Sequence, residues 1–130
     1  QFSEQSPVFV RLCEFLLSKQ REDGGWGEDF NACVRQVWVE NPDGSQVVNT
    51  AWAVMALMIA GGCNHRESIE RGVKFIVSRQ LEDGDWEQER ISGVFNGNAA
   101  IHYPGYKNSM PVWALGHYVN WKRTHGFQFP

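Results

Sequence analysis

A repeated segment constrains the fold of this chain more than any other feature of its sequence. Residues 15–26 recur as residues 75–86 without a gap, 60 positions further along. Phe, Ser, Gln, Glu, Asp, Gly and Trp are identical in the two copies, and each copy places a Gln six residues before a Trp. A segment that recurs at a fixed spacing indicates one structural unit used twice, with the two units packed against each other.

Each unit has the same predicted elements. Apolar residues at helical spacing predict a first helix over 8–19 and again over 68–79, and Glu-Asp-Gly ends each of them. A long loop follows, reaching through 93–109 in the second copy. It leads to a second helix, predicted over 50–60 with Asn49 or Thr50 as its cap, and over 111–121 with Pro111 in its first turn. The repeat units therefore run over about 8–62 and 68–122.

The second helices are apolar nearly all round, as in helices buried on more than one side. The first helices keep a polar face. This pattern predicts an all-α fold, with residues 1–130 forming part of an α/α barrel whose outer ring contains the first helices. Because two units cannot close a ring, we expect further sequence before Gln1. The polar residues after the last helix favour a natural end at Pro130.

Composition excludes several classes of function. The formal net charge is −3 and no basic stripe is present, which excludes nucleic acid as a partner. No apolar run approaches the ~20 residues of a membrane-spanning helix. Cys13, Cys33 and Cys63 have neither disulfide-framework nor zinc spacing, and we expect them to be reduced, mostly buried thiols. The four His residues lack metal-ligand spacing, so no metal or cofactor is predicted.

The two copies of the repeat resemble the QW motif of triterpene cyclases. Segments 23–30, 45–53, 93–96 and 113–116 are similar, in the same order, to the C-terminal end of oxidosqualene cyclases. The resemblance implies that the motif residues are structural, with each Gln packing on its Trp ring and bonding to a neighbouring helix end. A ligand-binding Trp is the alternative. The motif residues are Gln20, Trp26, Gln80 and Trp86.

The resemblance also implies a reaction, the carbocation cyclisation of 2,3-oxidosqualene to a sterol precursor such as lanosterol. In the family the initiating acid is an Asp in an Asp-Cys-Thr-Ala-Glu-like motif. That motif does not occur between Gln1 and Pro130, so we expect the fragment to be inactive alone. Its implied partners are the apolar triterpene substrate and the remainder of the cyclase chain. Peripheral, monotopic attachment to the endoplasmic reticulum membrane or a lipid droplet is also implied.

The candidate site lies in the loop that precedes the last helix. The resemblance places Phe95, Tyr103 and Tyr106 against the substrate cavity, with Ile101 and Ala99 setting its shape. A π face stabilises a cation without being a strong base, which suits carbocation chemistry. From spacing alone the three rings are ordinary structural aromatics. The family usually has a Ser-Cys-Ala-Ile-like stretch at 98–101, so Ala99 in place of Cys enlarges the pocket and leaves the product open.

Three other functions fit parts of this pattern. A squalene–hopene cyclase shares QW repeats but accepts squalene, and the blocks around residues 49–52 and 93–96 favour the oxidosqualene branch. A protein prenyltransferase β-subunit is also an α/α barrel but needs zinc ligands of Asp, Cys and His type, which the sequence does not present. A non-catalytic α/α-repeat binding module predicts a stable, closed monomer without cavity aromatics.

Overall fold

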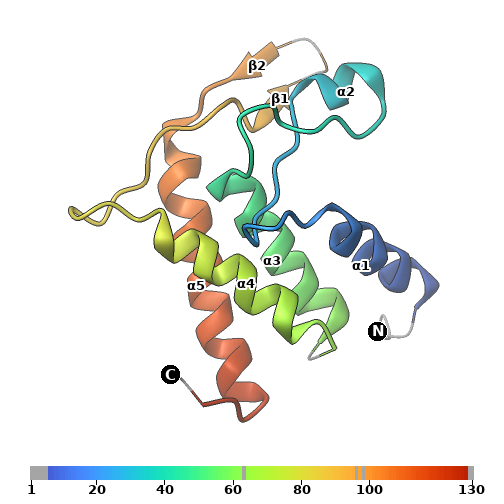
Figure 1. Cartoon of the computed structure of the whole chain (residues 1–130), viewed down its shortest axis with the longest axis vertical. Coiled ribbons are helices and arrows are strands. Elements are labelled where there is room, and N and C mark those ends of the chain that lie inside the picture. Colours follow the sequence, from blue (N-terminus) through green and yellow to red (C-terminus); the bar gives the residue numbers. More distant parts are fainter. Residues whose placement is uncertain (1–5, 63, 96, 98, 129–130) are drawn as a thin grey trace.

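The computed structural model describes residues 6–62, 64–95, 97 and 99–128, and within them the chain forms helices and one small hairpin (Figure 1). The elements follow the chain in this order: α1 Pro7–Lys19, α2 Asn31–Arg35, α3 Val47–Gly61, α4 Arg66–Ser78, β1 Gly93–Phe95, β2 Ala99–Ile101 and α5 Pro104–Thr124. The prediction of an all-α fold is confirmed. No helix in the described residues is both long and apolar enough to cross a membrane.

Helix α3 is the centre of the molecule, and α1, α4 and α5 all pack on it (Figure 1). Its side chains are buried on several faces, and Ala51, Val54 and Leu57 are 0% exposed. A helix that is apolar all round can be stable only in such a position. The sequence-based expectation for this helix therefore holds. Its predicted start does not, because α3 begins at Val47, with Gln46 rather than Asn49 or Thr50 in the cap position.

Helix α5 corrects the prediction for the second unit. It begins at Pro104, seven residues before the expected start, and Pro111 lies inside it. A proline at the first helical position needs no N–H donor, so Pro104 is well placed there. Helix α5 is also less buried than α3, because Val112 and Trp113 are 60% and 57% exposed.

The predicted loop over 93–109 contains a β-hairpin instead of irregular chain. Strands β1 and β2 are antiparallel, and Phe95 faces Ala99 in the register. Gly97 lies between them with a φ of +71°, a conformation that glycine adopts without steric cost. The cysteine prediction is also partly wrong, because Cys13 is buried whereas Cys33 is exposed. Cys63, Asn96 and Asn98 lie outside the described residues.

The tryptophans of the two QW turns make corresponding hydrogen bonds. In the first, the Trp26 indole Nε1 donates to Leu16 O over 2.7 Å. In the second, the Trp86 Nε1 donates to Ile76 O over 2.9 Å. Each indole thus donates to a carbonyl in the last turn of the preceding helix, where backbone carbonyls run out of helical partners. The Gln20 N–H bonds to Leu17 O and not to Leu16 O, whereas Ile76 O also accepts a bond from the Arg79 N–H. Trp26 and Trp86 are 1% and 2% exposed, so each turn is packed into the core.

The two glutamines differ in what they reach. Gln20 donates to Gly24 O within its own turn and to Ser68 O of α4, both over 2.9 Å, and it accepts a bond from the Ser68 hydroxyl. Gln80 donates to Gly84 O within its own turn, and its side chain lies at the surface. The first QW turn therefore joins the two repeat units to each other.

Candidate functional site

A small apolar cavity lies between the hairpin and the start of α5. Its volume is about 170 Å³, and its lining includes four of the five residues predicted from the sequence: Phe95, Ile101, Tyr103 and Tyr106, with Gly93 and Val94. The fifth, Ala99, is the ladder partner of Phe95. The structure thus brings together residues that the sequence separates by up to eleven positions.

Local structure explains how the two tyrosines come to share this cavity. Tyr103 occupies the cap position of α5 with extended backbone, and Tyr106 follows in the first helical turn. Their ring centroids are 4.7 Å apart at 68°, an edge-to-face contact. Tyr106 also meets Trp52 of α3 edge-on, with centroids 5.9 Å apart. The Tyr106 ring is therefore held between the hairpin end of the molecule and its central helix.

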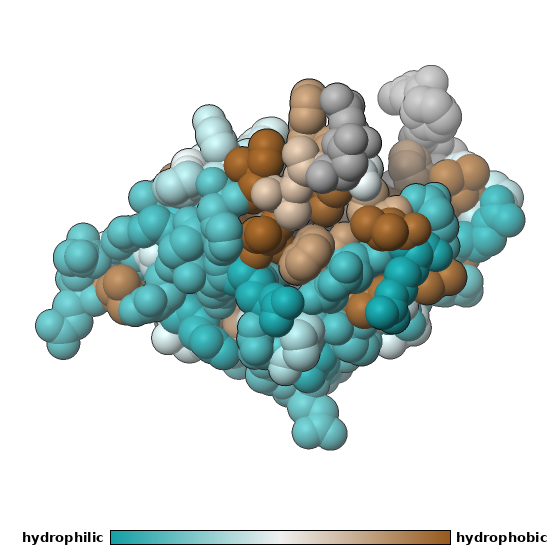
Figure 2. All heavy atoms as spheres, turned by 90° about the horizontal axis from the view of Figure 1, so that it is seen from above, coloured by the Kyte–Doolittle hydropathy of each residue, from teal (hydrophilic) through white to brown (hydrophobic). Residues whose placement is uncertain are grey.

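The rings of the cavity are open on one side. Phe95 and Tyr103 are 63% and 56% exposed, and Ile101 is 48% exposed. Figure 2 looks down on this end of the molecule, and brown apolar side chains gather there within a teal surround. A cluster of large, exposed apolar side chains is typical of a surface that binds another apolar group.

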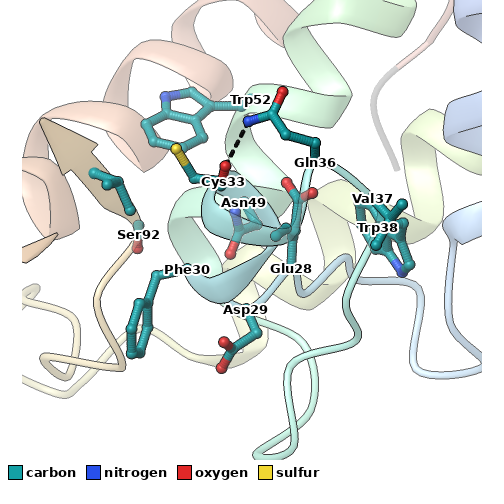
Figure 3. Close-up of a pocket in the computed structure, with 12 residues that line it drawn as sticks. Glu28, Asp29, Phe30, Cys33, Gln36, Val37, Trp38, Asn49, Trp52 and Ser92 are labelled. Atoms are coloured by element: carbon teal, nitrogen blue, oxygen red, sulfur yellow. Dashed lines mark hydrogen bonds between the residues drawn. The ribbon is translucent and has the colours of Figure 1, made fainter. Parts of the chain in front are cut away.

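A second pocket, which the sequence analysis did not predict, adjoins the first (Figure 3). Its volume is about 470 Å³, and it shares Val94 with the smaller cavity. Trp52 and Asn49 enter it from α3, and Cys33 enters it from α2. The sequence feature that could have indicated this pocket is the position of Trp52 near the start of a helix predicted to be buried.

Two carboxylates, those of Glu28 and Asp29, line this pocket. Asp29 is only 5% exposed, and it starts α2 by accepting bonds from the backbone N–H and the side-chain amide of Asn31. The backbone N–H of Asn31, followed by Asn31's amide and the Arg90 guanidinium, holds the pKa of Asp29 below its usual value despite burial. Burial raises the pKa of Glu28 in the same pocket.

A lysine fixes the start of α5 to the second QW turn. The Lys107 ammonium forms an ion pair with Asp85 and donates to Trp86 O over 2.8 Å. The hydrogen bond from Lys107 is the main cause of the lowered pKa of Asp85. Because Lys107 directly follows Tyr106, this contact also holds the tyrosine in place.

The repeated helical units, the tryptophan-capped turns and the aromatic cavity define an all-α repeat domain with an apolar binding site. Comparison with known proteins identifies its family. The squalene-hopene cyclase C-terminal domain family matches residues 1–120. The chain therefore belongs to this family, and the resemblance inferred from the QW motifs is confirmed.

Individual relatives agree with the family match. The chain is 48% identical to lanosterol synthase of Pneumocystis carinii over 117 residues, which cover 90% of this chain and 16% of that protein. It is 48% identical to lanosterol synthase of Homo sapiens over 83% of this chain and 14% of the human protein. It is 53% identical to cycloartenol synthase of Dictyostelium discoideum over 87% of this chain and 16% of that protein. The chain thus spans about a sixth of the length of these relatives.

Proposed function

We propose that this chain is the C-terminal part of a triterpene cyclase that converts 2,3-oxidosqualene to a sterol precursor such as lanosterol. In this proposal Phe95, Tyr103 and Tyr106 form part of the wall around the cations, and Ile101 and Ala99 shape it. The observation that carries the proposal is the apolar cavity in which Phe95, Ile101, Tyr103 and Tyr106 meet. Among the residues that the structure describes, none that lines this cavity carries a carboxylate.

The chemistry explains why such a lining suits a cyclase. Ring closure of a polyene passes through carbocations, which a nearby carboxylate would trap or deprotonate before the sequence is complete. A π face attracts a cation by about 0.5–2 kcal/mol per contact without acting as a strong base. Rings held in fixed orientation also keep the flexible substrate in a reactive conformation.

The remaining parts of the reaction are proposed for the rest of the parent protein. The relatives are about six times longer than this chain, which leaves ample sequence for the initiating acid and the other cavity walls. Attachment of the parent protein to the endoplasmic reticulum membrane or a lipid droplet also belongs to the proposal. The fragment alone is expected to be inactive.

The test uses the complete parent protein with 2,3-oxidosqualene and, separately, squalene. The wild type is compared with Phe95→Leu and Tyr103→Leu by analysis of the ring products. The matched control is Phe15→Leu, since Phe15 is an exposed ring of α1 that lines neither pocket described above. Altered or incompletely cyclised products from the two cavity variants, with normal products from the control, are expected.

Other results would change the proposal. Normal products at normal rate from both cavity variants would make the rings structural only. Cyclisation of squalene by the wild type would favour a squalene–hopene type of reaction. Absence of cyclisation with either substrate would favour a non-catalytic binding module.

A further inference from the structure

The hairpin that carries Phe95 needs support from outside itself. Strands β1 and β2 have three residues each, and in the described residues they pair only with each other. A two-stranded hairpin is at best marginally stable in water. The position of the Phe95 ring therefore depends on the chain segments that flank the hairpin.

Glu89, four residues before β1, is bound to the first repeat unit. Its carboxylate Oε2 accepts a bond from the backbone N–H of Val47 over 2.6 Å. Val47 is the first residue of α3, and α3 has no side-chain cap from its own cap residue, Gln46. A carboxylate at this place satisfies one of the free N–H groups and interacts favourably with the helix dipole. The second repeat thus caps the central helix of the first.

Arg90 is also bound to the first repeat unit. Its backbone carbonyl accepts a bond from the Gln46 amide over 3.2 Å, and Gln46 is only 2% exposed. Its guanidinium lies 3.3 Å from Asp29 and 3.1 Å from Asp43, both in the long loop of the first unit. We call Glu89 and Arg90, with these contacts, the clasp.

We propose that the clasp positions the aromatic hairpin, so that Glu89 and Arg90 determine which products form although neither touches the substrate. This inference rests on the proposed cyclase function. Neither residue lines the cavity of Phe95 and Tyr103, so both are positioning residues. Two residues, Ile91 and Ser92, separate the clasp from β1, and the Ser92 hydroxyl bonds back to Arg90 O over 3.3 Å.

The short connection explains how the effect reaches the cavity. A movement at Arg90 is passed along two residues to β1, whereas the far end of the hairpin is held separately by the contacts of Lys107. Loss of the clasp would therefore tilt the Phe95 side of the hairpin relative to Tyr103 and Tyr106. Displacements on this scale change the rates of competing reaction steps, because those rates depend on orientation.

The test uses the complete parent protein and four variants. Glu89→Ala and Arg90→Met remove the clasp contacts, whereas Glu89→Gln keeps an oxygen that accepts from the Val47 N–H. Since burial raises the pKa of Glu89, the neutral amide is expected to be well tolerated. Glu87→Ala is the matched control, because Glu87 is exposed in the same segment.

Product analysis is the first measurement. We expect Glu89→Ala and Arg90→Met to change the ratio of main to minor cyclised products by about tenfold, a difference of ~1.4 kcal/mol between competing barriers. Glu89→Gln is expected to restore most of the wild-type ratio, and Glu87→Ala to leave it unchanged. An unchanged product ratio in the folded Glu89→Ala and Arg90→Met proteins would overturn the inference, even if both are less heat-stable. Should Glu89→Ala fail to fold, Arg90→Met alone decides.

Hydrogen exchange of the substrate-free protein is the second measurement, and it does not depend on cyclisation. Amides of residues 93–101 are expected to exchange faster in Arg90→Met than in the wild type or in Glu87→Ala. Equal exchange would refute the anchoring role. If the wild type forms no ring product, the proposed function fails. The exchange rates of residues 93–101 in Arg90→Met and in the wild type still decide whether the clasp holds the hairpin.

Discussion

Replacing Trp26 by Phe tests whether the indole of a QW turn acts as a cap for the preceding helix. Helix α1 ends at Lys19, and the Gln20 N–H bonds to Leu17 O rather than to Leu16 O. The Trp26 indole supplies a donor to Leu16 O at 2.7 Å. Phenylalanine keeps an aromatic ring at this site but has no N–H, so the carbonyl loses that bond.

The cost follows from two contributions. A partly buried carbonyl left without its partner costs about 1–3 kcal/mol. Trp26 is 1% exposed, and the smaller ring of Phe also gives up buried apolar area worth about 1 kcal/mol. The sum is about 2–4 kcal/mol. At ~1.4 kcal/mol per factor of ten, local opening of the first QW turn becomes about 30-fold to several hundred-fold more frequent.

Hydrogen exchange in the complete parent protein measures this opening directly. Peptides covering residues 15–26 are expected to exchange faster in Trp26→Phe, whereas those covering 75–86 serve as an internal reference. Trp86→Phe should also speed exchange at 75–86, but by less, because Ile76 O accepts a bond from the Arg79 N–H as well as from the indole. A change of less than about threefold at 15–26 would refute the argument, since about 0.6 kcal/mol is below the cost of any orphaned carbonyl.

Two further predictions concern packing and pH. A Cβ at Gly72 would lie 2.5 Å from a Val54 methyl, so Gly72→Ala should lower the free energy of unfolding by about 1–3 kcal/mol. Gly116 has open space around it, so Gly116→Ala should not destabilise the protein. The thermal unfolding midpoints of the two variants check this. The lowered pKa of Asp29 stabilises the fold above the ordinary Asp pKa, and this contribution disappears as the pH falls through the lowered value. Asp29→Asn should therefore flatten the acid limb of a stability-versus-pH curve, and an unchanged limb would contradict the assignment.

The repeated turns could be predicted from the sequence because their chemistry is local. Gly24 and Gly84 adopt φ values of +88° and +89°, which the Glu-Asp-Gly pattern favours. The hairpin could not be predicted, because strands of three residues are too short for apolar alternation to be recognised. The start of α5 was misplaced because Pro104-Gly105 has the composition of a loop, while Pro111 has the features of a first helical turn.

The site could be predicted only in part, because some of its features are local in the sequence and others depend on contacts between distant residues. The aromatic residues lie within one short segment, and the family resemblance indicated them. The contacts that hold them in place connect distant residues, such as Glu89 with Val47 and Lys107 with Trp86. No periodicity or local spacing reports such pairs, since they depend on how the repeat units pack. The pocket beside Trp52 was missed on the same ground.

The most direct test of the central claim is the affinity of the complete parent protein for a stable cation mimic. The probe is a triterpene-like tertiary ammonium, compared with its neutral carbon isostere. The account predicts that the wild type prefers the ammonium by about tenfold, within the range expected from one or two cation–π contacts, and that Phe95→Leu or Tyr103→Leu removes most of this preference. Equal affinities of the wild type for the two compounds, or a preference that survives both substitutions, would contradict it.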